Sequence, residues 1–264
     1  MLFNNFFGYQ DEGYVFKIFG FAHFIPIIIM FILIFFLFYY RKKIRLWKYE
    51  ALFRHFFGAL MILNQMAYTY NNIYITSLLY KDEAIGAFPF PYASVTKDLP
   101  LSLCGISMIL TGFLFFNKSK RLFAILYFWV ICGATLAIIF PSAIANNTYG
   151  HFGPDKFRYY QFWIGHIGII MIIAYMIIVW EYKIKLKSLI YSFIWLIIFG
   201  ASTLIVNLIL DANYLFIMNP KDTGLNFLPN YPWSIPSFIL LGFIFYLIIF
   251  LPWHFIEKRK TAKS

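Results

Sequence analysis

Seven apolar runs of about 20 residues, separated by charged or Gly- and Pro-rich connections, dominate this sequence. A helix needs about 20 residues to cross the roughly 30 Å hydrocarbon core of a bilayer. Hydrophobic residues make up 62% of the 264 residues and charged residues 12%, which is too little polar material to cover a soluble domain. The runs predict an all-α, polytopic membrane protein with one transmembrane domain over residues 1–264. We expect its seven helices over residues 18–40, 51–79, 99–116, 122–140, 160–180, 188–210 and 235–255.

Basic residues predict the orientation of this seven-helix bundle. Of the 22 Lys and Arg residues, 15 fall in four alternate segments, and the positive-inside rule makes that side cytoplasmic. The N-terminus is then outside and the C-terminus in the cytoplasm. The net charge of +11 therefore reflects topology and indicates no nucleic-acid partner. The four segments contain Arg41, Lys42, Lys43, Arg45 and Lys48; Lys118, Lys120 and Arg121; Lys183, Lys185 and Lys187; and Lys258, Arg259, Lys260 and Lys263.

The connections on the predicted outer side are long, and those on the inner side are short. Residues 80–98, 141–159 and 211–234 are rich in Gly, Pro, Asn and aromatic residues. Long loops on one face of a rigid bundle are where binding and catalytic residues usually lie. We therefore expect the functional site near the outer face.

Polar side chains inside the runs lie at similar depths below that face. Counted from the outer helix ends, they are about five to eight residues in, or roughly 8–12 Å at the helical rise. They are His23, Asn71, Asn72, Cys104 and His166. Three runs also have a polar stripe at helical spacing, which predicts a polar cavity open to the outside. The stripes are Asn64, Tyr68 and Asn71 or Asn72; Cys104, Ser107 and Thr111; and Thr203, Asn207 and Asp211.

A cysteine and a histidine that folding brings together are the minimum for catalysis by a thiol nucleophile. The imidazole removes the thiol proton, which is needed because a thiol is mostly protonated at neutral pH, and the thiolate attacks a carbonyl carbon. Asn side chains or N–H groups at a helix end can stabilise the resulting oxyanion. The residues therefore favour acyl transfer, with Cys104 as nucleophile and His23 or His166 as base.

Other interpretations stay open on the residues alone. Cys104 can be a small packing residue, and each histidine can be a hydrogen-bonded core group. His23 and His166 can also be axial ligands of a haem, or with Cys104 hold a transition metal. The polar stripes can instead line the site of a non-enzymatic binder or a transporter of a small polar solute.

Short motifs at the predicted outer helix ends carry a family resemblance. They are Phe21-Ala22-His23, Leu99-Pro100-Leu101-Ser102-Leu103-Cys104, Phe140-Pro141-Ser142, Gly165-His166, Asn213-Tyr214 and Tyr231-Pro232-Trp233. In these motifs and their order, over most of its length, the chain resembles the bacterial YwaF-like integral membrane proteins. That family is related to eukaryotic transmembrane protein 164.

In the eukaryotic relatives, the resemblance implies an acyltransferase that moves a fatty acyl chain between phospholipids through a cysteine thioester. Carried over by motif, Cys104 is the nucleophile and His166 the general base, with His23 the second candidate. One position departs from the family pattern, because Ser102 stands where the family usually has histidine two residues before the cysteine. Residues two apart on a helix point to different faces, so that histidine need not be the base.

We therefore predict an acyltransferase that moves an acyl chain from a phospholipid to a lysolipid or another hydroxyl acceptor at the outer leaflet, with a lipid hydrolase that uses the same Cys-His site as an alternative enzyme. Membrane phospholipids are its expected partners, and no metal, cofactor or protein partner is predicted. AT-rich codon usage, inferred from abundant Phe, Ile, Lys and Asn, favours the plasma membrane of a low-GC bacterium. Supporting or substrate-binding roles fall to His23, Asn71, Asn72, Ser107, Asn207 and Asp211.

Overall fold

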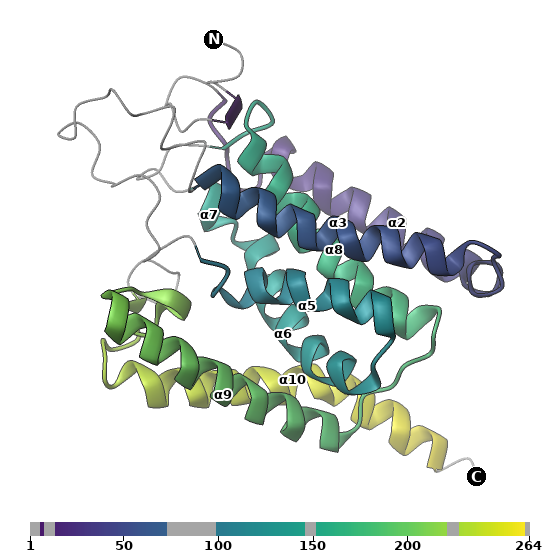
Figure 1. Ribbon diagram of the computed structural model, residues 1–264. Helices are drawn as coiled ribbons and strands as arrows, with labels where there is room; N and C mark the ends of the chain where they lie inside the picture. The colour runs from purple at the N-terminus through teal and green to yellow at the C-terminus, as the bar shows by residue number, and fades with distance from the viewer. Residues whose placement is uncertain (1–5, 8–13, 73–98, 146–151, 221–226, 262–264) are drawn as a thin grey trace.

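The computed structural model describes residues 6–7, 14–72, 99–145, 152–220 and 227–261, and within these ranges the chain is helical without strands. Seven helices of 15 residues or more follow one another in the predicted order (Figure 1). A short helix α7 (Ser142–Ala145) and a 3₁₀ turn η2 (Tyr214–Phe216) complete the described elements. The long helices are α2 (Phe21–Arg45), α3 (Glu50–Tyr70), α5 (Leu103–Asn117), α6 (Lys120–Ile139), α8 (Phe157–Ile178), α9 (Leu186–Leu210) and α10 (Ser234–Thr261).

Five of these helices are long and apolar enough to cross a membrane, so the protein is a multi-pass membrane protein. They are α2, α6 with its extension to Ala145, α8, α9 and α10. Helix α5 is apolar but has 15 residues, which is about 22 Å and shorter than a bilayer core. Helix α3 carries charged and amide side chains that lower its hydropathy. Seven crossings and the orientation of the termini stay predictions.

Helix ends differ from the predicted ends for identifiable reasons. Helix α3 ends at Tyr70, and residues 73–79 of the predicted 51–79 helix lie outside the described residues. Helix α2 continues to Arg45, past the predicted end at residue 40, and α10 continues to Thr261. Lys and Arg are good helix formers and are favourable near a helix C-terminus, so the basic clusters extend these helices instead of ending them.

Helix α8 lies at the centre of the bundle. It contacts α2, α3, α5 and α6. In its most apolar stretch 67% of the residues are buried, against 11% for α9 and 17% for α10. Helices α9 and α10 form a pair at one edge that packs onto α6 (Figure 1). Their outward faces carry exposed apolar side chains, as expected for surfaces in contact with lipid.

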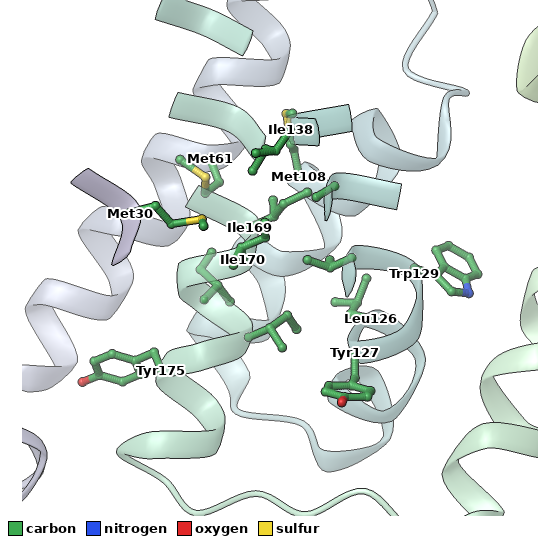
Figure 2. Packing of buried hydrophobic residues seen from close by; sticks show 14 of the residues in the cluster. Met30, Met61, Met108, Leu126, Tyr127, Trp129, Ile138, Ile169, Ile170 and Tyr175 are labelled. Carbon is green, nitrogen blue, oxygen red and sulfur yellow. The ribbon is translucent and has the colours of Figure 1, made fainter. Parts of the chain in front are cut away.

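Glycine contacts determine the register of α3, α5 and α8. A Cβ atom added at Gly112 of α5 would lie 2.6 Å from the Gly58 carbonyl oxygen of α3, so the two backbones touch. Cβ atoms added at Gly165 and Gly168 of α8 would lie 2.4 Å from side-chain atoms of Met108 and Met61, respectively. The two methionines lie close together in the buried core (Figure 2). Gly105 of α5 lies against Gln65 and Gly165 of α8 against Asn64, so α3 is antiparallel to both partners and α5 and α8 run in the same direction.

Candidate active site

Cys104 is the second residue of α5, directly behind a serine N-cap. The Ser102 Oγ accepts a hydrogen bond from the Gly105 N–H at 3.0 Å, and the Ser102 carbonyl accepts from Ile106 N–H at 3.0 Å. Serine is among the preferred N-cap residues because its hydroxyl satisfies an N–H group of the first turn. Ser102, which replaces the histidine of the family pattern, therefore fixes the start of the helix that carries Cys104.

The first turn of α5 offers free amide groups beside the thiol. Within the part of the chain that the structure describes, the N–H groups of Leu103 and Cys104 make no hydrogen bond. The first N–H groups of a helix have no partner within that helix, and they point along its positive dipole end. Such groups stabilise a nearby anion. The N–H groups of Leu103 and Cys104 are therefore available to an anion at this end of α5.

The Cys104 side chain points toward α6 at a glycine. A Cβ atom added at Gly133 would lie 3.3 Å from the Cys104 Sγ and 3.5 Å from a methyl carbon of Leu103. Both distances are at or near the lower end of normal contacts, so the absence of a side chain at residue 133 provides room beside the sulfur.

His166 has a defined neutral form. Its Nδ1 lies 2.8 Å from the carbonyl oxygen of Phe162, one turn earlier on α8, and a carbonyl only accepts. We therefore assign the proton to Nδ1, which leaves a lone pair on Nε2. Within the described residues Nε2 makes no hydrogen bond. A buried imidazole with an available lone pair is suited to remove a proton.

The register of α5 and α8 gives the relative heights of Cys104 and His166. Met108 packs against Gly165, so Cys104, four residues before Met108 on the parallel helix α5, is level with residues 161–162 of α8. The His166 ring turns back over this same turn, with its centroid 4.2 Å from that of Phe162. The backbone positions of Cys104 and His166 therefore differ by about one turn, roughly 6 Å along the axis, and the histidine side chain points back toward the level of Cys104.

The two side chains approach α6 from different sides. Gly165 faces α3 and α5, and Trp163 faces α2, where its ring centroid lies 5.6 Å from that of His23. His166 lies between these directions on the helical wheel, in the sector of the remaining long neighbour, α6. Cys104 faces α6 at Gly133. Cys104 and His166 therefore both lie on helix faces that are turned toward α6.

His23 has a different bonding pattern. Its Nδ1 accepts a hydrogen bond from the Phe19 N–H at 2.8 Å, and its Nε2 lies 2.8 Å from the Ile138 carbonyl oxygen. Both ring nitrogens are used, and the contact with Ile138 holds α2 against α6. A role as base or as axial haem ligand would require one of these bonds to break.

The family model that matches this chain is that of the TMEM164 family, over residues 18–250. The chain belongs to the TMEM164 family. This match confirms the predicted relation to transmembrane protein 164, whereas membership of the YwaF-like bacterial branch stays a prediction. A search of curated proteins and a search of solved structures gave no significant match.

The other predicted residues of this TMEM164-family chain fall into two groups. Ser107 is buried one turn below Cys104, and its hydroxyl has no hydrogen-bond partner within the described residues. Asn71 and Asn72 are buried at the end of α3. Asp211, in contrast, is exposed at the left-handed C-cap of α9. No three His, Cys, Asp or Glu side chains in the described ranges lie together as metal ligands.

Asn207 links α9 of this TMEM164-family protein to the η2 turn. Its Nδ2 donates to the Tyr214 carbonyl at 2.9 Å, and its Oδ1 accepts from the Tyr214 N–H at 2.8 Å. The Tyr214 hydroxyl in turn accepts from the Leu99 N–H at 2.9 Å, just before α5. Asn207 and Tyr214 thus support the chain segment that leads to Cys104.

Sequence reasoning missed two residues of this TMEM164-family site. Ser102 was noted only as a departure from the family pattern, although a serine before an apolar run is a recognised helix-start signal. Gly133 gave no signal, because a glycine inside an apolar helix does not reveal which side chain of another helix it faces.

Proposed function

We propose that this TMEM164-family protein is an acyltransferase that moves a fatty acyl chain from a phospholipid to a lysolipid or another hydroxyl acceptor through a thioester on Cys104. The outer leaflet is the proposed place of reaction. Three observations support the proposal: a thiol in the first turn of α5, N–H groups of that turn without a hydrogen bond in the described residues, and a buried imidazole on the neighbouring helix α8 whose Nδ1 is bonded to a carbonyl. The family relation supports the same chemistry.

In the first half-reaction, the His166 Nε2 takes the proton of the Cys104 thiol, and the thiolate attacks the ester carbonyl carbon of the phospholipid. The negative charge moves to the carbonyl oxygen, where the N–H groups of Leu103 and Cys104 stabilise it. The intermediate then expels the glycerol oxygen of a lysophospholipid. That oxygen takes the proton from the imidazolium, and the acyl chain stays on sulfur as a thioester.

In the second half-reaction, a hydroxyl group of the acceptor replaces the departed lysophospholipid. The His166 Nε2 now takes the hydroxyl proton, the oxygen attacks the thioester, and the same amides stabilise the oxyanion. The carbon–sulfur bond breaks, and the thiolate recovers its proton from the imidazolium. The reaction therefore needs no external cofactor, and water in place of the acceptor would give a free fatty acid.

A lipid substrate fits the position of the site. Cys104 lies at the start of a helix of 15 residues, which is shorter than the bilayer core, and its neighbours are long apolar helices. The buried hydroxyl of Ser107 lies one turn further along the same face and is suited to hydrogen-bond an ester or headgroup oxygen.

Acyl transfer in nanodiscs tests this proposal. Protein reconstituted with a labelled phospholipid and a lysophospholipid acceptor should form labelled diacyl product. Cys104→Ala should abolish the product, and His166→Gln should reduce the rate by about 10²–10⁴-fold, as expected for loss of a general base. Cys132→Ala is the matched control, because this half-buried cysteine lies on α6 outside the proposed machinery, and it should keep the wild-type rate. Full activity of Cys104→Ala would exclude the thioester route.

A binder of a small polar solute is the second candidate, because the hydroxyls of Ser107 and Thr203 are buried without partners in the described ranges. A bound solute would supply those hydrogen bonds. Such a protein would show solute-dependent thermal stabilisation that Cys104→Ala leaves unchanged, together with no acyl transfer. The acyltransferase requires the opposite result for Cys104→Ala.

A further inference from the structure

A buried ion pair at the opposite end of the bundle holds an indole ring in place. The Glu50 Oε1 of α3 accepts hydrogen bonds from Arg54 Nε at 2.8 Å, from the Tyr175 hydroxyl at 2.8 Å and from Trp180 Nε1 at 3.0 Å. The Arg54 guanidinium also donates to the Phe115 carbonyl oxygen. Both charged residues are buried, and such a fully bonded network is rigid. Trp180 is therefore fixed relative to α3, α5 and α8.

Two cations from different helix ends lie over this fixed ring. The Lys118 Nζ is 3.8 Å from the Trp180 ring centroid, and the Arg45 Cζ is 5.6 Å from it. Lys118 is the left-handed C-cap of α5, and Arg45 is the last residue of α2. Both are within the distance at which a cation is attracted by an aromatic face. The Trp180 ring thus holds basic side chains from the ends of two helices close together.

A third cation belongs to the same group. Lys120 Nζ lies 5.9 Å from the Tyr182 ring centroid, and the Tyr182 hydroxyl donates to the Lys118 carbonyl oxygen at 2.5 Å. Burial raises the pKa of Tyr182 above its ordinary value, so this hydroxyl stays a donor at physiological pH. We call Arg45, Lys118 and Lys120, held on Trp180 and Tyr182, the aromatic-cation cluster.

The aromatic-cation cluster has more positive than negative charge. Glu181 pairs with Arg45 at 3.4 Å, while Glu50 is already occupied by Arg54. Three cations and one carboxylate leave a formal charge of +2 on the cluster. Like charges held this close repel one another, so a bound anion would be favourable. Lys and Arg side chains form strong, charge-assisted hydrogen bonds with a phosphate group, which would offset this repulsion.

The anion we propose is the headgroup of an anionic phospholipid in the leaflet at this end of the bundle. The aromatic-cation cluster lies where α2 and α5 end and α6 begins, next to apolar faces that contact lipid chains. Trp and Tyr are enriched at this headgroup level, and clustered Lys and Arg beside a membrane span bind anionic lipids. The bound lipid would link the ends of α2 and α5 to the α8–α9 connection. This inference does not depend on the acyltransferase proposal.

Lipid binding to the full-length protein, measured by native mass spectrometry in detergent, tests the inference. Phosphatidylglycerol should bind more tightly than phosphatidylcholine to the wild-type chain. The double variant Arg45→Gln/Lys118→Gln should bind phosphatidylglycerol about 25-fold more weakly, since each basic residue near an anionic headgroup contributes about fivefold. Lys118→Arg should keep most of the preference, because it keeps the charge.

A matched control removes the same charge elsewhere on the same side. Lys48 lies over the Tyr49 ring, and Lys187 is exposed at the start of α9. Lys48→Gln/Lys187→Gln should retain phosphatidylglycerol binding within about twofold, as expected for a non-specific surface contribution. Equal losses in the two double variants, or equal binding of both lipids to the wild-type chain, would overturn the inference. Full competition by soluble glycerol 3-phosphate would show a free-phosphate site and would also overturn it.

If the aromatic-cation cluster only neutralises the negative ends of the helices, thermal unfolding should give a different result. Thermal unfolding of Arg45→Gln/Lys118→Gln would then occur at the same lowered temperature in both lipids. The lipid-site inference predicts that phosphatidylglycerol raises the unfolding temperature of the wild-type chain but not that of this variant.

Discussion

Single hydrogen bonds set the chemistry available at the candidate site. The bond from the Gly105 N–H to Ser102 fixes where α5 starts and leaves two amides beside the thiol. The bond between His166 Nδ1 and Phe162 leaves Nε2 as an acceptor. His23 is the counterexample, because both of its nitrogens are bonded. Whether a histidine can accept a proton thus depends on which of its ring nitrogens has no hydrogen bond, and not only on the residue type.

Ser102→Ala tests how much the N-cap hydroxyl stabilises the first turn of α5. Loss of an N-cap hydroxyl costs about 1 kcal/mol, so the unfolding temperature should fall by about 2–4 °C for a chain of this size. Ser102→Asp should keep the wild-type temperature, since aspartate is an equally good cap. Ser237→Ala serves as control because this exposed hydroxyl only bonds within α10. If Ser102→Ala unfolds like the wild-type chain, the cap has no part in holding the first turn of α5.

At the scale of elements, glycines decide how closely helices approach around α5. Gly58 and Gly112 let the backbones of α3 and α5 touch, and Gly133 leaves space on α6 for the Cys104 side chain. A short helix held by such contacts on two sides has little freedom to slide. The sulfur is therefore positioned by helix packing as well as by its own turn.

Gly133→Ala tests this positioning. The added methyl carbon would lie 3.3 Å from the Cys104 Sγ, so either the sulfur or α6 must shift by a few tenths of an ångström. Small displacements of a reacting group are costly, and we expect roughly tenfold slower alkylation of Cys104 by a lipid-soluble maleimide, measured in a Cys132→Ala background. Gly200→Ala should leave the rate unchanged, because a Cβ atom there meets nothing within 4 Å. Equal rates in both variants would contradict the account of Gly133.

The order and type of the elements follow from the sequence, whereas the details of the site do not. Apolar run lengths predict the seven long helices because membrane thickness imposes them. The family motifs ranked His166 before His23, but residue type and depth alone did not, because the difference lies in a bond from His23 to Ile138 on a distant helix. Such contacts depend on packing and leave no local pattern.

At the scale of the whole molecule, the bundle has a buried centre and a lipid-facing edge. Helix α8 is enclosed by its neighbours, while α9 and α10 lie at one edge and carry exposed apolar side chains (Figure 1). The proposed active site lies near the start of α5 and α8, and the aromatic-cation cluster lies near their ends. The proposed orientation places these two sites in opposite leaflets.

Cysteine labelling tests that orientation. In a background without Cys104 and Cys132, single cysteines replace Asp222 in the predicted outer connection and Lys187 at the predicted inner start of α9. A membrane-impermeant maleimide added to intact cells should label position 222 and leave position 187 unlabelled until the cells are lysed. Labelling of position 187 in intact cells, with position 222 protected, would invert the topology and move the proposed reaction to the other leaflet.

The acyl-enzyme itself is the most direct test of the central claim. Intact-mass analysis of purified protein after incubation with a phospholipid should show the added mass of one fatty acyl chain, removable by neutral hydroxylamine as a thioester is. The adduct should form in Cys132→Ala, form far more slowly in His166→Gln, and be missing in Cys104→Ala. A wild-type chain that never acquires the adduct, or an adduct that persists in Cys104→Ala, would contradict a thioester mechanism at this cysteine.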